Sequence, residues 1–188
     1  MTKTSGEAPI ALHQLLLLRH AKSSWDDASQ PDHERPLSGR GRRAAKAMGH
    51  TMRDLGLAPD VVLVSTATRT LQTLQALEPW DETPLTERLD VLYLADPPKL
   101  LGVLHAVADT ARSVLLIGHN PGLHELAILL VGPHAMTQAN EMTRRLAERY
   151  PTGALAEFAI PGPWSTLGEG GGRLLRFLMP RDLPELAH

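Results

Sequence analysis

Two arginines and two histidines in this sequence have the chemistry needed to bind and transfer a phosphoryl group. Arg19 and His20 are adjacent, whereas Arg69 and His119 lie far along the chain from them and from each other. Guanidinium groups hold phosphoryl oxygens in bidentate fashion, and a neutral imidazole is a competent nucleophile toward phosphorus. We therefore expect a site in which His20 becomes phosphorylated and Arg19, Arg69 and His119 bind the phosphate.

The same residues would supply the positive charge that a metal otherwise brings to phosphoryl transfer. His119 in its protonated form would neutralise charge on the equatorial oxygens, beside Arg19 and Arg69. We therefore expect neither a metal nor another cofactor. The His-Glu pair at 124–125 resembles the start of a zinc-protease helix, but Ile128 stands where that motif needs a second histidine.

The hydrophobic pattern predicts the elements that position these side chains. Three short apolar runs, 15–18, 61–64 and 114–117, have the length and composition of buried central strands. Segments with helical spacing separate them, which predicts an α/β fold: a three-layer αβα sandwich with a mainly parallel sheet and helices on both faces. Because the carboxyl ends of parallel strands meet at one edge, the residues that follow these runs should converge there.

Residues with capping side chains mark the expected helix starts. Ser38 should cap a helix that ends at Gly56, either Ser65 or Thr66 should cap the helix with Arg69, and Asn120-Pro121 should open a third. We expect Gly132-Pro133 to end that third helix. Further elements are expected as a short strand within 84–94, a helix opened by Pro97-Pro98, a helix over 137–150 and a hairpin of 154–160 with 173–179.

Length and composition limit the classes of protein that this sequence could represent. The chain has 188 residues, which favours one domain, so we expect a tail over 1–12 and a single catalytic domain over 13–188. It has no Cys and a net charge of -2, which exclude a thiolate nucleophile and give no reason to expect nucleic acid or a membrane as partner. No apolar stretch approaches the roughly 20 residues of a membrane span, and a cytoplasmic protein is expected.

Four strings of residues in fixed order resemble the histidine phosphatase superfamily, which includes the histidine acid phosphatases and the phosphoglycerate mutase-like proteins. Within this superfamily they resemble the SixA-type phosphohistidine phosphatases. They are Leu17 to Ser23, Arg35 to Ser38 with Gly41, Ser65 to Thr70, and Gly118 to Gly122. The resemblance covers about residues 15–180. It implies an αβα fold, His20 as the phosphorylated nucleophile, and Arg19, Arg69 and His119 as the phosphate pocket. Ala21 and Lys22 replace the Gly and Glu usual in the larger mutase-like relatives, which favours the SixA-type branch.

The general acid is the residue that the resemblance leaves open. In relatives that act on phosphate monoesters, a carboxylate near the short middle strand protonates the leaving group, and Glu87 and Asp90 are the nearest candidates. Either side chain could instead simply be solvated. Asp26 stands where mutases tend to have a phosphate-binding Asn, and a carboxylate there would repel phosphate. We do not assign Asp26 that role.

The leading hypothesis is a phosphatase with a phosphohistidine intermediate. By resemblance, its substrate is phosphohistidine on a partner protein of the histidine phosphotransfer type, as in signal transduction. The absence of a large insertion between 64 and 114 leaves room for a protein-borne phosphate. One alternative is a phosphatase for small phosphate esters, and another is a non-catalytic phosphate-recognition protein. The basic helix start over 40–46 is either a solvated face or a contact for an acidic substrate protein.

Overall fold

The apolar runs of the sequence form the centre of a six-stranded sheet. In the computed structural model, which describes residues 12–186, the parallel strands are β1 (His13–Arg19), β2 (Val61–Ser65), β3 (Leu85–Leu89) and β4 (Ser113–Gly118). The sheet is completed by β5 (Leu155–Ile160) and β6 (Arg173–Leu178), and its order is β3-β2-β4-β1-β5-β6. β5 runs antiparallel to both β1 and β6, so the sheet is mostly parallel with two antiparallel pairs.

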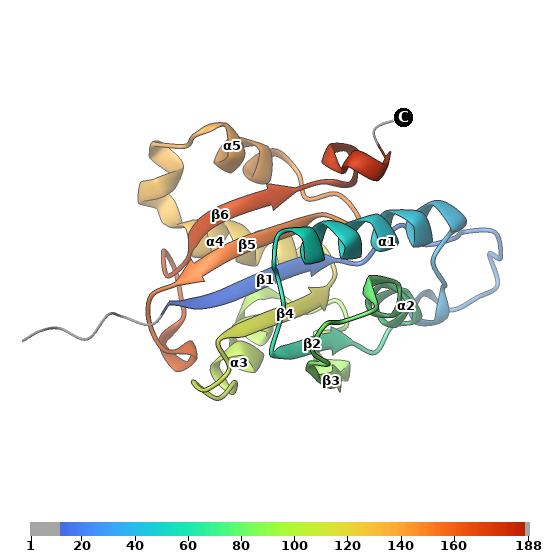
Figure 1. The fold of residues 1–188 in the computed structure, drawn as a ribbon, viewed down its shortest axis with the longest axis horizontal. Coiled ribbons are helices and arrows are strands. Elements are labelled where there is room, and N and C mark those ends of the chain that lie inside the picture. Colours follow the sequence, from blue (N-terminus) through green and yellow to red (C-terminus); the bar gives the residue numbers. More distant parts are fainter. Residues whose placement is uncertain (1–11, 187–188) are drawn as a thin grey trace, which may run out of the picture.

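Helices cover both faces of this sheet (Figure 1). On one face lie α1 (Gly39–Asp54) and α2 (Thr68–Leu77), and on the other lie α3 (Pro97–His105), α4 (Gly122–Thr137) and α5 (Glu141–Glu148). Because side chains alternate along a strand, Leu16 and Leu18 of β1 pack into the cluster with Met48 of α1. Leu15 and Leu17 enter the opposite cluster, which holds the apolar side of α4. The predicted three-layer α/β fold is confirmed.

Short 3-10 helices connect several of these elements. They are η1 (Asp32–Glu34), η2 (Asp90–Leu92), η3 (Trp164–Thr166), η4 (Pro180–Asp182) and η5 (Pro184–Leu186). The tail expected over 1–12 lies outside the described residues except for Leu12, and the single domain over 13–188 stays a prediction. None of the helices within 12–186 is both long and apolar enough to cross a membrane.

Ser38 caps α1 as expected, since its hydroxyl accepts a hydrogen bond from the backbone N–H of Gly41 at 3.0 Å. The cap predicted at Ser65 or Thr66 is wrong. α2 begins after Ala67, whose side chain makes no capping bond. The Ser65 hydroxyl lies 2.8 Å from the imidazole of His119 instead.

The cap predicted at Asn120 is also wrong, because its side-chain amide donates to the carbonyl of Tyr150 at 2.9 Å. α4 begins one residue later than expected, after Pro121. Gly132 interrupts α4 with a φ of 75°, as the Gly-Pro pair predicted, but helical turns resume as far as Thr137. The helix expected over 137–150 is therefore the shorter α5, which Asn140 caps.

Candidate active site

Arg19, His20, Arg69 and His119 line one open cavity of about 490 Å³ at the carboxyl edge of the parallel strands. The register of β1 and β4 explains why the two histidines meet. Arg19 pairs with Gly118, so the next residue of each strand lies level with the other. The two imidazole centroids are 5.2 Å apart. Arg69 joins them from the first turn of α2, which follows the neighbouring strand β2.

His20 is held as a neutral imidazole. Its Nδ1 lies 2.7 Å from the carbonyl oxygen of Ala21. A carbonyl oxygen can only accept, so Nδ1 carries the proton and Nε2 keeps its lone pair. Burial is the main cause that lowers the pKa of His20, to about 4, and the charges of Arg69 and Arg19 act in the same direction. His20 is thus a free base at neutral pH.

His119 is neutral as well, and the protonated form expected with phosphoryl oxygens bound stays a prediction. Its Nε2 lies 2.8 Å from the Ser65 hydroxyl and its Nδ1 lies 3.4 Å from a guanidinium nitrogen of Arg69. A guanidinium can only donate, so Nδ1 accepts and Nε2 carries the proton. Burial first, and then the charges of His20 and Arg69, lower the pKa of His119 to about 3. Bound anionic charge in the cavity would act in the opposite direction.

Backbone carbonyls hold both guanidinium groups at the cavity. One terminal nitrogen of Arg19 donates to the carbonyl of Tyr150 at 2.9 Å, and that oxygen also accepts from Asn120. One terminal nitrogen of Arg69 donates to the carbonyl of Asp32 at 2.6 Å. Burial and the neighbouring Arg69 lower the pKa of Arg19, but a guanidinium remains a cation in proteins. Two positive charges therefore face one cavity.

Asp32 is the residue of this cavity that the sequence analysis did not single out. Its carboxylate accepts from Arg69 at 3.0 Å, from the Tyr93 hydroxyl at 2.7 Å and from Arg35 at 3.0 Å. The Tyr93 hydrogen bond, followed by the Arg69 contacts, lowers the pKa of Asp32, so this carboxylate is ionised at neutral pH. The one available signal was its spacing of three residues before Arg35, which suits an ion pair in a helical turn.

The three carboxylates discussed from the sequence do not line this cavity. Glu87 lies at the middle of β3 and lines a different cavity with Leu63 and Lys99. Asp90 begins η2 and is exposed. Asp26 accepts from the hydroxyl of Ser24 at 2.7 Å. Of the described side chains, Asp32 is therefore the carboxylate that the cavity contains.

Within residues 12–186, no three or more His, Cys, Asp or Glu side chains come together in a way that could hold a metal ion. His124 Nε2 donates a hydrogen bond to the carbonyl oxygen of Leu146 at 2.7 Å, because a carbonyl oxygen can only accept. His124 thus joins α4 to α5, and Glu125 is exposed.

Comparisons with known proteins extend over most of the chain. A model of the histidine phosphatase superfamily (branch 1) matches residues 15–90. An uncharacterized protein of Mycobacterium tuberculosis, Rv1276c, is 35% identical over 164 residues, which are 87% of this chain and 100% of that protein. A candidate phosphohistidine phosphatase SixA from Nakamurella multipartitia has 31% identity and a TM-score of 0.80, covering 92% of this chain and 99% of that one. The protein histidine phosphatase SixA complexed with tungstate has 25% identity and a TM-score of 0.72, covering 90% and 99%.

Proposed function

We propose that this chain, which belongs to the histidine phosphatase superfamily and to its SixA-type branch, removes the phosphoryl group from phosphohistidine on a partner protein. His20 is the nucleophile, and Arg19, Arg69 and His119 bind the phosphoryl oxygens. The observation that carries the proposal is the hydrogen bond from His20 Nδ1 to the Ala21 carbonyl, which leaves Nε2 as a free base in the cavity that Arg19 and Arg69 line. Neither a metal nor another cofactor takes part.

In the first displacement, Nε2 of His20 attacks phosphorus and the bond from phosphorus to the substrate imidazole breaks. A substrate ring that is protonated on its other nitrogen leaves as a neutral imidazole. His20 ends in the form that the substrate had, with a proton on Nδ1 and phosphorus on Nε2. No proton needs to move, and the Ala21 carbonyl holds the Nδ1 proton throughout.

In the second displacement, water attacks phosphorus and the bond from phosphorus to Nε2 breaks. Phosphate leaves with both protons of the water, and His20 returns to its neutral form. Positive charge from Arg19 and Arg69 stabilises the oxygens in both steps. Once anionic oxygens are bound, His119 becomes a better base, and a proton on its ring would add to that stabilisation.

The carboxylates of the site favour a phosphoramidate over a phosphate ester as substrate. An alkoxide leaving group needs a proton, and a general acid has to be protonated at the working pH to supply it. Asp32 is ionised, and Glu87 and Asp90 lie outside the cavity. A neutral imidazole needs no such acid. A phosphatase for small phosphate esters therefore remains the weaker hypothesis.

A cytoplasmic location stays a prediction of the sequence.

The test is turnover of two substrates with chelator present throughout: a histidine phosphotransfer domain carrying phosphohistidine, and small alkyl phosphates. We expect kcat/KM to be far higher for the phosphoprotein, and we expect a His20→Ala variant to lose both activities. An aryl phosphate, whose leaving group needs no acid, serves as a control for an intact site. Equal or better turnover of alkyl phosphates, or activity that requires an added divalent ion, would contradict the proposal.

A further inference from the structure

A second cavity, of about 240 Å³, adjoins the active site and is lined by four cationic side chains. They come from four separate places in the chain: Lys22 follows β1, Arg40 begins α1, Arg149 follows α5 and Arg181 lies in η4. The remaining lining is mostly apolar, with Ala44 and Met179 buried beneath the charges. We call this cavity the basic pocket.

The basic pocket adjoins the catalytic cavity. Lys22 and Thr152 line both of them. The backbone N–H of Gly153, next to Thr152, donates to the carbonyl oxygens of Arg19 and His20 at 3.1 and 3.0 Å. The segment between the two cavities is thus tied directly to the nucleophile. A ligand whose phosphoryl group lies at His20 would have its neighbouring atoms at the basic pocket.

Three of the four cations of the basic pocket have no carboxylate partner among the described residues. Within residues 12–186, no Asp or Glu lines this pocket, and Lys22, Arg40 and Arg149 form no ion pair. Arg181 approaches the carboxylate of Asp182 only at 3.9 Å. The positive charge is therefore concentrated in one place on a chain whose net charge is -2.

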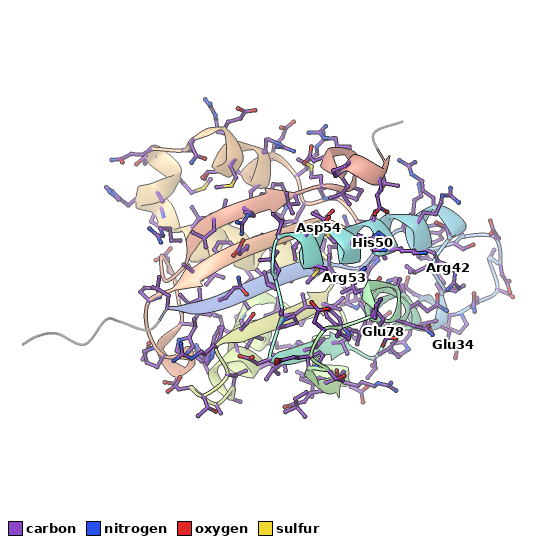
Figure 2. All side chains as sticks on the ribbon, viewed as in Figure 1. Glu34, Arg42, His50, Arg53, Asp54 and Glu78 are labelled. Atoms are coloured by element: carbon purple, nitrogen blue, oxygen red, sulfur yellow. The ribbon has the colours of Figure 1, made fainter. Side chains whose placement is uncertain are left out.

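Other cations of α1 are differently placed. Arg42 and Arg53 lie on the side of α1 that faces α2 (Figure 2). Arg42 donates to Gln72 at 3.3 Å, and Arg53 donates to the carbonyl of Leu77 at 2.8 Å. These two arginines join helices within the fold. Arg40 is also exposed, but its side chain makes none of these bonds and lines the basic pocket.

We propose that the basic pocket binds carboxylates of Asp or Glu side chains that lie beside the phosphohistidine on the substrate protein. Cations without a carboxylate partner attract anions. Because four cationic side chains surround one pocket, the pocket suits a protein surface that carries several carboxylates. The described lining contains no aromatic ring on which a nucleotide base could stack. This inference rests on the proposed function and deepens it, since it names the surface chemistry of the substrate.

The test uses two phosphohistidine peptides, one with Asp and Glu at the flanking positions and one with Asn and Gln. The variant pair Arg40→Gln/Arg149→Gln removes two charges from the basic pocket. The matched control, Arg112→Gln/Arg173→Gln, removes two exposed arginines at the opposite edge of the sheet, at the starts of β4 and β6. An aryl phosphate, which has no second anion, reports on the catalytic cavity alone.

We expect the wild-type chain to prefer the acidic peptide by roughly tenfold in kcat/KM at low salt, and the preference to shrink as ionic strength rises. The basic-pocket pair should lose most of that preference and keep its activity on the aryl phosphate, whereas the control pair should keep both. No preference in the wild-type chain, or an equal loss in both pairs, would overturn the inference.

Failure of the proposed function would look different, because neither peptide would be turned over while the aryl phosphate still was. An assay with a small bisphosphate tests whether the second anion is instead a second phosphate of a small-molecule substrate. If the basic-pocket pair lowered kcat/KM for a bisphosphate and not for the acidic peptide, the pocket would belong to a small-molecule substrate and the inference would be wrong.

Discussion

The two histidines of the site are alike in chemistry but are held by opposite partners. The carbonyl of Ala21 makes Nδ1 of His20 a donor, and the guanidinium of Arg69 makes Nδ1 of His119 an acceptor. One arrangement leaves Nε2 free for attack, and the other keeps His119 neutral beside a cation. Single hydrogen bonds therefore distinguish the proposed nucleophile from the proposed anion-binding group.

Anion binding should be coupled to proton uptake by the two imidazoles of the cavity. A bound dianion raises the pKa of His20 and of His119 above their lowered values, so a charged form of the pair becomes favourable. We expect sulfate, whose charge is constant near neutrality, to bind with uptake of up to about one proton and to bind more weakly as pH rises. Calorimetry in buffers of different ionisation enthalpy measures the uptake. A variant with both His20→Gln and His119→Gln should abolish the uptake; no uptake in the wild-type chain would contradict this coupling.

Asp32 is expected to act as a positioning residue for Arg69. Asp32→Asn keeps the shape of the side chain but removes the charge that orients the guanidinium. We expect kcat on an aryl phosphate to fall by roughly tenfold while KM stays the same or decreases, because a repelling carboxylate is also lost. Asp27→Asn is the matched control, since Asp27 lies in the same loop and bonds only Ser29. An unchanged kcat for Asp32→Asn would rule out the positioning role.

At the scale of elements, α4 approaches the segment between η2 and α3 so closely that only glycine fits at its first position. A Cβ on Gly122 would lie 1.8 Å from the carbonyl oxygen of Ala95, and Leu123 bonds back to the carbonyl of His119. We expect Gly122→Ala to push α4 away, to lower the free energy of unfolding by about 1–3 kcal/mol or more, and to reduce kcat/KM by displacing His119.

Gly102 in α3 is the matched control, because a Cβ there would meet nothing within 4 Å. Gly102→Ala should stabilise the chain by about 0.5–1 kcal/mol, since alanine favours a helix interior, and should leave the kinetics unchanged. Urea unfolding and aryl phosphate turnover measure both variants. Equal stability and activity of the two would show that α4 tolerates the displacement.

The sequence predicts elements best where local signals decide. The apolar runs formed β1, β2 and β4, and Ser38 capped α1. The caps expected at Ser65 and Asn120 are absent because both side chains form hydrogen bonds with distant partners. Ser65 bonds His119, and Asn120 bonds the carbonyl of Tyr150. Asp32 was missed for the same reason, since Arg69 and Tyr93 reach it from remote segments. Residue types indicated the chemistry of the site, and tertiary contacts decided which carboxylate lines the catalytic cavity.

At the scale of the whole molecule, the buried histidines should make the fold sensitive to acid. His20 and His119 have folded-state pKa values of about 4 and about 3, below the ordinary 6.5 of the unfolded chain. The unfolded chain thus binds more protons as pH falls, and stability decreases from about pH 6.5 downward, by about 1.4 kcal/mol for each pKa unit of difference at most. Above pH 6.5 both states are neutral and this contribution is constant.

Urea unfolding at a series of pH values between about 7 and 4.5 measures this slope. A variant with both His20→Gln and His119→Gln should show a markedly flatter dependence over that window. A wild-type slope no steeper than that of the double variant would mean that the two imidazoles are not held neutral by the fold.

The central claim is that His20 carries the phosphoryl group during turnover. Rapid quenching in alkali, which spares phosphohistidine and hydrolyses an acyl phosphate, should trap label from a phosphorylated substrate on the peptide that contains His20. His20→Ala should give no label and lose on the order of a thousandfold or more in rate, because no other group can form the intermediate. If label never appears at His20 in the wild-type chain and His20→Ala retains near-normal turnover, water attacks phosphorus directly and His20 is not the nucleophile.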